Sequence, residues 1–193
     1  MPNLTPARRT FSTLVGMASR GTTSPNETDV PWLSSAEETA WIGLMAIVSK
    51  LPAALDGQLQ RDSGIGRFEY SVLSWLSMSE GRMLRMSTLA ELANGSLSRL
   101  SNVVKRLEQQ NFMRREPDPT DGRYTVAQLT DAGWDCVVAA APGHVRAVRH
   151  FVFDVLTAAE VDQLGQIGRK VGDRLRTDLP SVACTEAGAE PVC

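Results

Sequence analysis

The feature that most constrains this chain is a closely spaced pair of helix signals between residues 88 and 109. Thr88-Leu-Ala-Glu91 fits a capping box, in which a hydroxyl and a carboxylate satisfy backbone donors at a helix start. It predicts a very short helix over Leu89–Ala93, which Asn94-Gly95 ends. A second helix follows, capped by Ser96, and its apolar residues share one stripe: Leu97, Leu100, Val104 and Leu107. This spacing predicts a helix-turn-helix.

The segments around this pair predict a mainly α protein with a small β-hairpin. Phe112–Glu116 and Tyr124–Leu129 are expected to be strands that flank the turn-rich segment Pro117–Gly122. A capping box at Ser35-Ala-Glu-Glu38 predicts a long helix to about residue 61, kinked at Pro52. Helical patterning returns at 131–155, interrupted by Pro142-Gly143, and Thr157-Ala-Ala-Glu160 caps a last helix.

Composition separates a folded body from two polar ends. Residues 1–30 and 179–193 are rich in small and polar residues and are expected to be disordered, whereas 31–178 form one domain. Uninterrupted apolar runs such as Val137–Ala141 fall far short of the roughly 20 residues that span a bilayer. The start of the chain also lacks an apolar segment followed by a cleavage site. A cytoplasmic protein without a membrane partner is therefore expected.

The exposed face of the second predicted helix carries side chains that suit DNA. If its apolar stripe is buried, the opposite side presents Ser98, Arg99, Asn102, Lys105, Arg106 and Gln109. Such groups can bond base edges in a major groove or phosphate oxygens. From Gly95 to Arg115, five cations stand against Glu108 alone, although the whole chain has a formal net charge of -2. The alternative is an ordinary solvated helix face.

Arg123 is the candidate contact of the hairpin. It follows the turn, where a guanidinium can reach the negative potential of a narrow minor groove, and Asp121 can orient it by ion pairing. The alternative is a common Asp-Gly turn beside a solvated arginine.

Four segments resemble the MarR family of transcriptional regulators: Met86-Ser-Thr-Leu-Ala-Glu-Leu-Ala93, Val103-Val-Lys-Arg-Leu-Glu108, Arg114-Arg-Glu-Pro-Asp-Pro-Thr-Asp-Gly-Arg123 and Leu129-Thr-Asp-Ala-Gly133. The resemblance implies a winged helix-turn-helix over about 67–130 and dimerisation helices at about 35–61 and 131–177. It implies a homodimer on double-stranded DNA, contacted through Ser87, Thr88, Ser96, Ser98, Arg99, Asn102, Lys105, Arg106, Arg114, Asp121 and Arg123. Many relatives carry arginine where this chain has Asn102 and Gly122, so the operator sequence does not carry over.

The resemblance also suggests a small aromatic or phenolic effector, held in a crevice between the dimerisation helices and the DNA-binding lobe. The candidate lining residues are Trp41, Phe68, Tyr70, Trp75 and Trp134, for which plain core packing is the alternative. Cys136 is a candidate redox sensor, and its alternative is a buried, unreactive thiol. His144 and His150 lie six residues apart and do not share a helix face, so no metal site is expected.

No nucleophile elbow, phosphate-binding glycine loop or dinucleotide fingerprint is found, so neither an enzyme nor a cofactor is expected. The resemblance thus implies a homodimeric repressor that binds a pseudo-palindromic operator and is released by a small ligand. Two alternatives remain: a winged-helix module for protein contacts only, and a redox-sensing regulator acting through Cys136.

Overall fold

The computed structural model describes residues 30–178 in two compact units, residues 30–44 and residues 45–178. The predicted disorder of 1–30 and 179–193 lies, apart from Val30, outside the described residues. The helices are α2 (Ser35–Ser63), α3 (Arg67–Met78), α4 (Met86–Leu92), α5 (Leu97–Gln109), α6 (Asp131–Phe151) and α7 (Ala158–Asp178). The strands are β1 (Met83–Arg85), β2 (Met113–Pro117) and β3 (Thr125–Leu129), and short 3-10 turns lie at Glu80–Arg82 and Phe153–Val155.

The long first helix begins one residue away from its predicted cap. Ser34, not Ser35, forms the capping box: its backbone N–H donates to Glu37 Oε2 at 2.7 Å, and the Glu37 N–H donates to Ser34 Oγ at 3.4 Å. The predicted box was wrong because two serines and two glutamates stand side by side and offer the same spacing twice. The helix then runs through Pro52 to Ser63.

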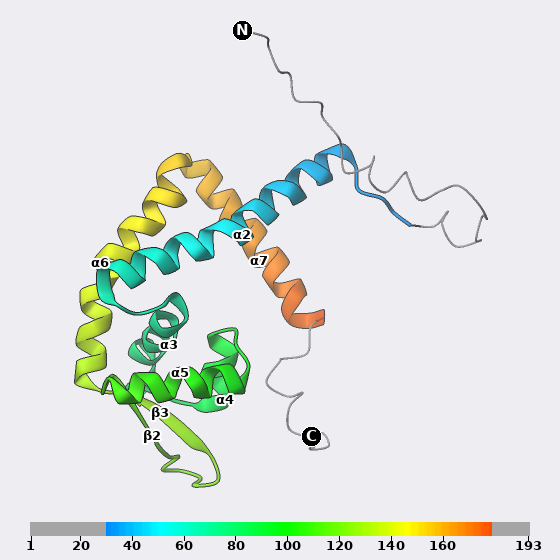
Figure 1. Cartoon of the computed structure of the whole chain (residues 1–193). Helices are drawn as coiled ribbons and strands as arrows, with labels where there is room; N and C mark the ends of the chain where they lie inside the picture. The colour runs from blue at the N-terminus through cyan, green and yellow to red at the C-terminus, as the bar shows by residue number, and fades with distance from the viewer. Residues whose placement is uncertain (1–29, 179–193) are drawn as a thin grey trace, which may run out of the picture. The chain divides into compact units, whose positions relative to one another are not determined.

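The core of the second unit lies between α3, α4, α5, the sheet and the start of α6. Its fully buried side chains include Leu73, Leu76, Leu89, Leu100 and Leu107. The sheet is antiparallel in the order β1-β3-β2, with Arg85 opposite Val126 and Met113 opposite Leu129. The β2–β3 hairpin extends away from the helices beside α5 (Figure 1). The mainly α fold with a hairpin is confirmed, and β1 adds a third strand that the sequence pattern did not predict.

That third strand also changes how α4 begins. β1 leads directly into α4, whose cap residue is Arg85, so Thr88 lies inside the first turn. The predicted start at a Thr88 capping box was therefore wrong. The cap of α5 is confirmed, because Ser96 Oγ accepts the Arg99 N–H at 3.2 Å. Val103 is buried on α5, whereas Leu97 is only half-buried.

The last two helices are longer and more exposed than the core helices. α6 continues through Pro142 and Gly143, so the predicted interruption there was wrong. α7 is capped as predicted by Thr157 and Glu160, with Glu160 Oε2 2.8 Å from the Thr157 backbone nitrogen. None of the 21 residues of α7 is buried.

Among the described residues, α2 is the one helix long and apolar enough to cross a membrane on length and composition alone. Its most apolar 18-residue window has a mean hydropathy of 1.2 and contains no buried residue. Counting uninterrupted apolar runs overlooked this helix, because polar residues divide its sequence.

Candidate nucleic-acid interface

The side of α5 opposite its buried stripe presents a row of polar side chains. Leu100, Val103, Val104 and Leu107 face the core. By helical periodicity, the side chains directed most nearly away from them are those of Ser98, Asn102, Lys105 and Gln109, and all four are exposed. This row combines hydroxyl, amide and ammonium groups, which can read base edges and bond phosphates.

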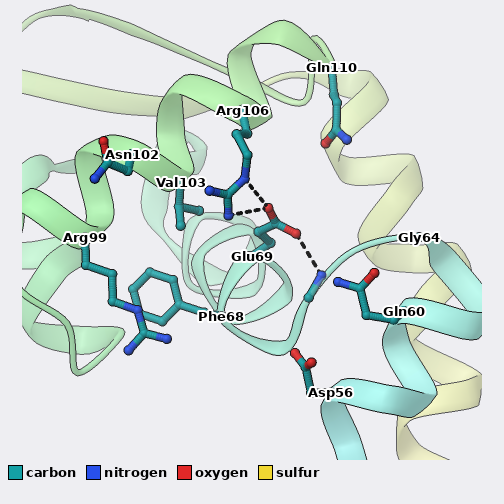
Figure 2. Close-up of a pocket in the computed structure, with 11 residues that line it drawn as sticks. Asp56, Gln60, Gly64, Phe68, Glu69, Arg99, Asn102, Val103, Arg106 and Gln110 are labelled. Atoms are coloured by element: carbon teal, nitrogen blue, oxygen red, sulfur yellow. Dashed lines mark hydrogen bonds and ion pairs between the residues drawn. The ribbon is translucent and has the colours of Figure 1, made fainter.

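Two arginines predicted to lie on this face occupy its flank and already have partners. The Arg99 guanidinium carbon lies 4.1 Å from the centre of the Phe68 ring. Arg106 donates from Nε and Nη2 to Glu69 Oε1, at 3.0 and 2.9 Å (Figure 2). Arg106 is therefore held against α3, and the outward row is narrower than the sequence predicted.

An open recess of about 550 Å³ lies beside this flank, between the end of α2, the start of α3 and α5 (Figure 2). Asp56, Glu69, Arg99, Asn102 and Arg106 are among its lining residues. Its walls thus carry both signs of charge.

The aromatic residues predicted to line an effector site do not all border this recess. Phe68 lines it, whereas Tyr70 stacks against His144 with ring centres 4.7 Å apart. Trp75 packs against the core, and Trp134 lies under the Arg82 guanidinium at 4.2 Å. Trp41 belongs to the first unit and is exposed.

Arg123 at the end of the hairpin loop is held by the carboxylate of Asp121. Its Nε donates to Oδ1 at 2.9 Å, and its Nη2 donates to Oδ2 at 2.6 Å. This hydrogen bonding lowers the pKa of Asp121 and raises the pKa of Arg123. The Arg123 side chain nevertheless remains 83% exposed. The predicted ion pair is confirmed, and it leaves the guanidinium accessible.

A second carboxylate, which sequence reasoning missed, anchors the loop from inside. Asp118 is buried and accepts the Thr120 hydroxyl at 2.7 Å, the Thr120 N–H at 2.8 Å and Arg85 Nε at 2.6 Å. These bonds, those from Thr120 foremost, hold the pKa of Asp118 well below its usual range. Arg85 also lies 4.3 Å from the centre of the Tyr124 ring. The signal in the sequence was Asp-Pro-Thr, whose Asp and Thr have the spacing of an Asx turn.

Other cations of the predicted patch are partly neutralised. Arg115 pairs with Glu108 at 2.7 Å, and this hydrogen bond lowers the pKa of Glu108. Arg114 donates to Gln128 Oε1 at 2.6 Å and lies 3.6 Å from Glu116. Glu116 and Glu69 lie outside the segment from Gly95 to Arg115 over which the charges were counted. Because both pair with arginines of that segment, the local excess of positive charge is smaller than the sequence suggested.

The comparisons with known proteins agree with this geometry. The MarR family model matches residues 67–125. The HTH-type transcriptional regulator MhqR of Bacillus subtilis is 30% identical over 110 residues, which cover 56% of this chain and 73% of that protein.

The chain belongs to the MarR family.

Solved MarR-family structures share its fold. The regulator Sco3205 of Streptomyces coelicolor, solved in complex with DNA, is 42% identical with a TM-score of 0.73. That match covers 83% of this chain and 97% of Sco3205. AbsC from the same organism is 34% identical with a TM-score of 0.73, covering 77% of this chain and all of AbsC. The protein is thus a MarR-family transcriptional regulator with a DNA-binding winged helix-turn-helix, in which the β2–β3 hairpin is the wing.

The remaining candidate residues of this MarR protein lie in different settings. Ser87 and Thr88 are exposed on α4, whereas the Ser96 hydroxyl is engaged as the α5 cap. Cys136 is half-buried on α6, and burial raises the pKa of its thiol. A raised pKa reduces the thiolate fraction that reacts with oxidants. Within residues 30–178, no three His, Cys, Asp or Glu side chains are grouped to hold a metal ion.

Proposed function

We propose that this MarR-family protein is a cytoplasmic homodimeric repressor that inserts α5 into the major groove and Arg123 into the minor groove of a pseudo-palindromic operator. The observation that carries the proposal is the Asp121–Arg123 pair, which displays an 83% exposed guanidinium on the wing beside α5. Ser98, Asn102 and Lys105 on α5 supply groups for base edges and phosphates. The other proposed contacts are Ser87, Thr88, Ser96, Arg99 and Arg114, whereas Arg106 is held by Glu69.

The test compares Arg123→Ala with Asn102→Ala on operator fragments selected from genomic DNA. Losing a groove-inserted guanidinium should weaken operator binding by about 1–3 kcal/mol per subunit, or roughly 5- to 150-fold for each half-site. Asn102→Ala should change base preference more than overall affinity. Arg146→Ala, which removes an exposed arginine of α6, is the control for net charge. Operator binding that is unchanged in both test variants would refute the proposed interface.

Dimerisation is supported by the unburied apolar face of α7. Leu164, Ile167, Val171 and Leu175 recur at helical spacing and are between 44% and 59% exposed. Exposed apolar stripes of this kind mark interaction sites. A second copy is the proposed partner, because two-fold operators match two-fold proteins.

Sedimentation equilibrium tests the dimer. Burying an isoleucine contributes about 1.5–3 kcal/mol, and a two-fold interface contains each contact twice. Ile167→Asp should therefore raise the dimer dissociation constant by at least about 100-fold. Gln166→Asp adds the same charge on the opposite side of α7 and should leave the dimer intact. A wild-type protein that is monomeric at micromolar concentration would contradict the dimer.

Release by a small aromatic or phenolic ligand is the regulatory part of the proposal. It is supported by the recess beside α5, because an occupant of this recess would touch Arg99, Asn102 and Arg106 on the recognition helix. A ligand shifts the equilibrium by its differential affinity for free and DNA-bound protein. Titration of phenolic acids into the protein–operator complex should displace the operator. If no compound of a broad panel displaces it, the proposed ligand release is refuted.

The two alternatives lead to different results. A winged-helix module for protein contacts would show no salt-sensitive DNA binding. A redox regulator acting through Cys136 would lose operator binding on mild oxidation, and the raised pKa of this thiol argues against that behaviour.

A further inference from the structure

The contact between Glu69 and Arg106 joins α3 to the recognition helix. Glu69 lies in the first turn of α3, and Arg106 lies one helical turn after Asn102 on α5. Both Nε and Nη2 of Arg106 bond the same carboxylate oxygen, at 3.0 and 2.9 Å (Figure 2). The side chain of Glu69 is 14% exposed, while that of Arg106 is 57% exposed. The pair therefore has a shielded anion and an accessible cation.

Glu69 is held in place by the backbone at the start of α3. Its second oxygen, Oε2, accepts the Gly66 N–H at 2.7 Å. The next N–H, that of Arg67, is bonded by Asp56 Oδ1 of α2 at 2.7 Å. A freely moving surface ion pair contributes little, about 0–1 kcal/mol, because both side chains lose entropy on pairing. In this pair the Glu69 carboxylate is already oriented by the fold, so its pairing with Arg106 loses less side-chain entropy.

We propose that Glu69 limits sequence-independent DNA affinity by withholding Arg106 from the DNA phosphates. Arg106 lies beside the outward row of α5, where a released guanidinium can reach the backbone of a bound duplex. A phosphate contact adds affinity for any sequence, whereas base contacts discriminate between sequences. By holding Arg106, Glu69 lowers the affinity for DNA of any sequence, so base contacts supply a larger share of operator binding. Glu69 is thus a positioning residue that acts through Arg106.

The inference rests on the proposed function only in requiring that α5 bind DNA. Glu69→Gln is the informative variant, because its amide oxygen can still accept the Gly66 N–H while its charge is lost. Arg106→Gln and the double variant show whether an effect runs through Arg106. Glu80→Gln is the matched control: it removes an equal charge from an exposed residue that forms no ion pair within residues 30–178.

The measurement is the salt dependence of binding to a mixed-sequence duplex and to a selected operator. One added phosphate contact steepens the slope of log affinity against log salt by about 0.9, hence about 1.8 for a dimer. A fourfold increase in salt concentration should therefore weaken DNA binding by Glu69→Gln about 12-fold more than it weakens binding by the wild type. Glu69→Gln should also bind both duplexes more tightly at low salt, by a similar factor. Arg106→Gln, the double variant and Glu80→Gln should keep the wild-type slope.

Three results would overturn the inference: an unchanged slope in Glu69→Gln, a shallower slope in Arg106→Gln, or a steeper slope that persists in the double variant. Urea unfolding midpoints verify that each variant is folded. If wild type itself shows no salt-dependent DNA binding, the proposed interface fails instead, so the two failures are distinguishable.

Discussion

Replacing Gly133 with alanine tests how α6 is joined to the wing. Thr130 caps α6, with its hydroxyl accepting the Gly133 N–H at 3.0 Å and donating to the Asn111 carbonyl at 2.6 Å. The Thr130 N–H donates to the Phe112 carbonyl at 3.1 Å. A Cβ on residue 133 would lie 2.0 Å from that same carbonyl oxygen and 2.7 Å from Leu129 Cδ1. The start of α6 therefore has no room for a methyl group.

The size of the effect follows from this geometry. Ordinary contact begins at about 3.4 Å, so the helix start must move about 1.4 Å from the Phe112 carbonyl. Such a shift breaks the Thr130 backbone bond, which contributes about 1 kcal/mol, and adds packing strain of about 1–3 kcal/mol. The expected loss in the free energy of unfolding is about 2–4 kcal/mol. With a urea m-value of about 2 kcal/mol per molar, the midpoint should fall by about 1–2 M.

Urea unfolding at fixed protein concentration measures this loss, because the midpoint of an oligomer depends on concentration. Gly165→Ala in α7 is the matched control. Its added Cβ would meet nothing closer than Arg169 at 3.7 Å, so a gain of about 0.5–1 kcal/mol from helix propensity is expected. If Gly133→Ala unfolds within about 0.5 kcal/mol of wild type, the argument from close approach is refuted.

Two further predictions concern titratable groups. The pKa of Asp118 is lowered by folding, so its stabilising contribution is complete above the ordinary carboxyl pKa of about 3.9 and is lost as the pH falls below that value. Asp118→Asn should lower the urea midpoint at neutral pH and flatten its decline below about pH 4; a decline as steep as in wild type would contradict this. Burial raises the pKa of Cys136, so in a variant with serine at Cys184 and Cys193 it should be alkylated more slowly in the folded than in the urea-unfolded protein. Faster alkylation when folded would favour the redox alternative.

The elements that the sequence predicted correctly are those with complete local signals. Helix α5 has its capping serine, its apolar stripe and its terminating turn within one continuous segment. The strands of the wing flank a segment rich in proline and glycine. Such features depend on neighbours in sequence, so they can be recognised without knowing the fold.

The errors arose where distant residues decide the structure. Met83–Arg85 is a strand only because β3 pairs with it, and that pairing moves the start of α4 to Met86. A segment of three residues is too short to show the alternating pattern that predicts a strand. At Ser34 and Ser35, two equivalent caps compete, and the sequence pattern does not rank them.

The sequence indicated the candidate residues on α5 and the hairpin, but it did not indicate two ion pairs between residues that are distant in sequence. Arg106 and Glu69 are 37 residues apart in sequence, and Arg85 and Asp118 are 33 apart. A count of charges within one segment cannot detect such partners. The sequence therefore located the cations near α5 and the wing, while the structure shows which of them are already bound to carboxylates.

The fork between Asp121 and Arg123 has a consequence for the entropy cost of the DNA contact proposed for Arg123. An arginine side chain loses about 1.5–2 kcal/mol of rotamer freedom when it becomes fixed. Asp121 engages only the Nε and Nη2 edge of the guanidinium, so the Nη1 hydrogens remain available. Much of the ordering has thus taken place before any duplex arrives. Lysine at this position, with a flexible stem and no planar fork, would have to be ordered by the DNA itself.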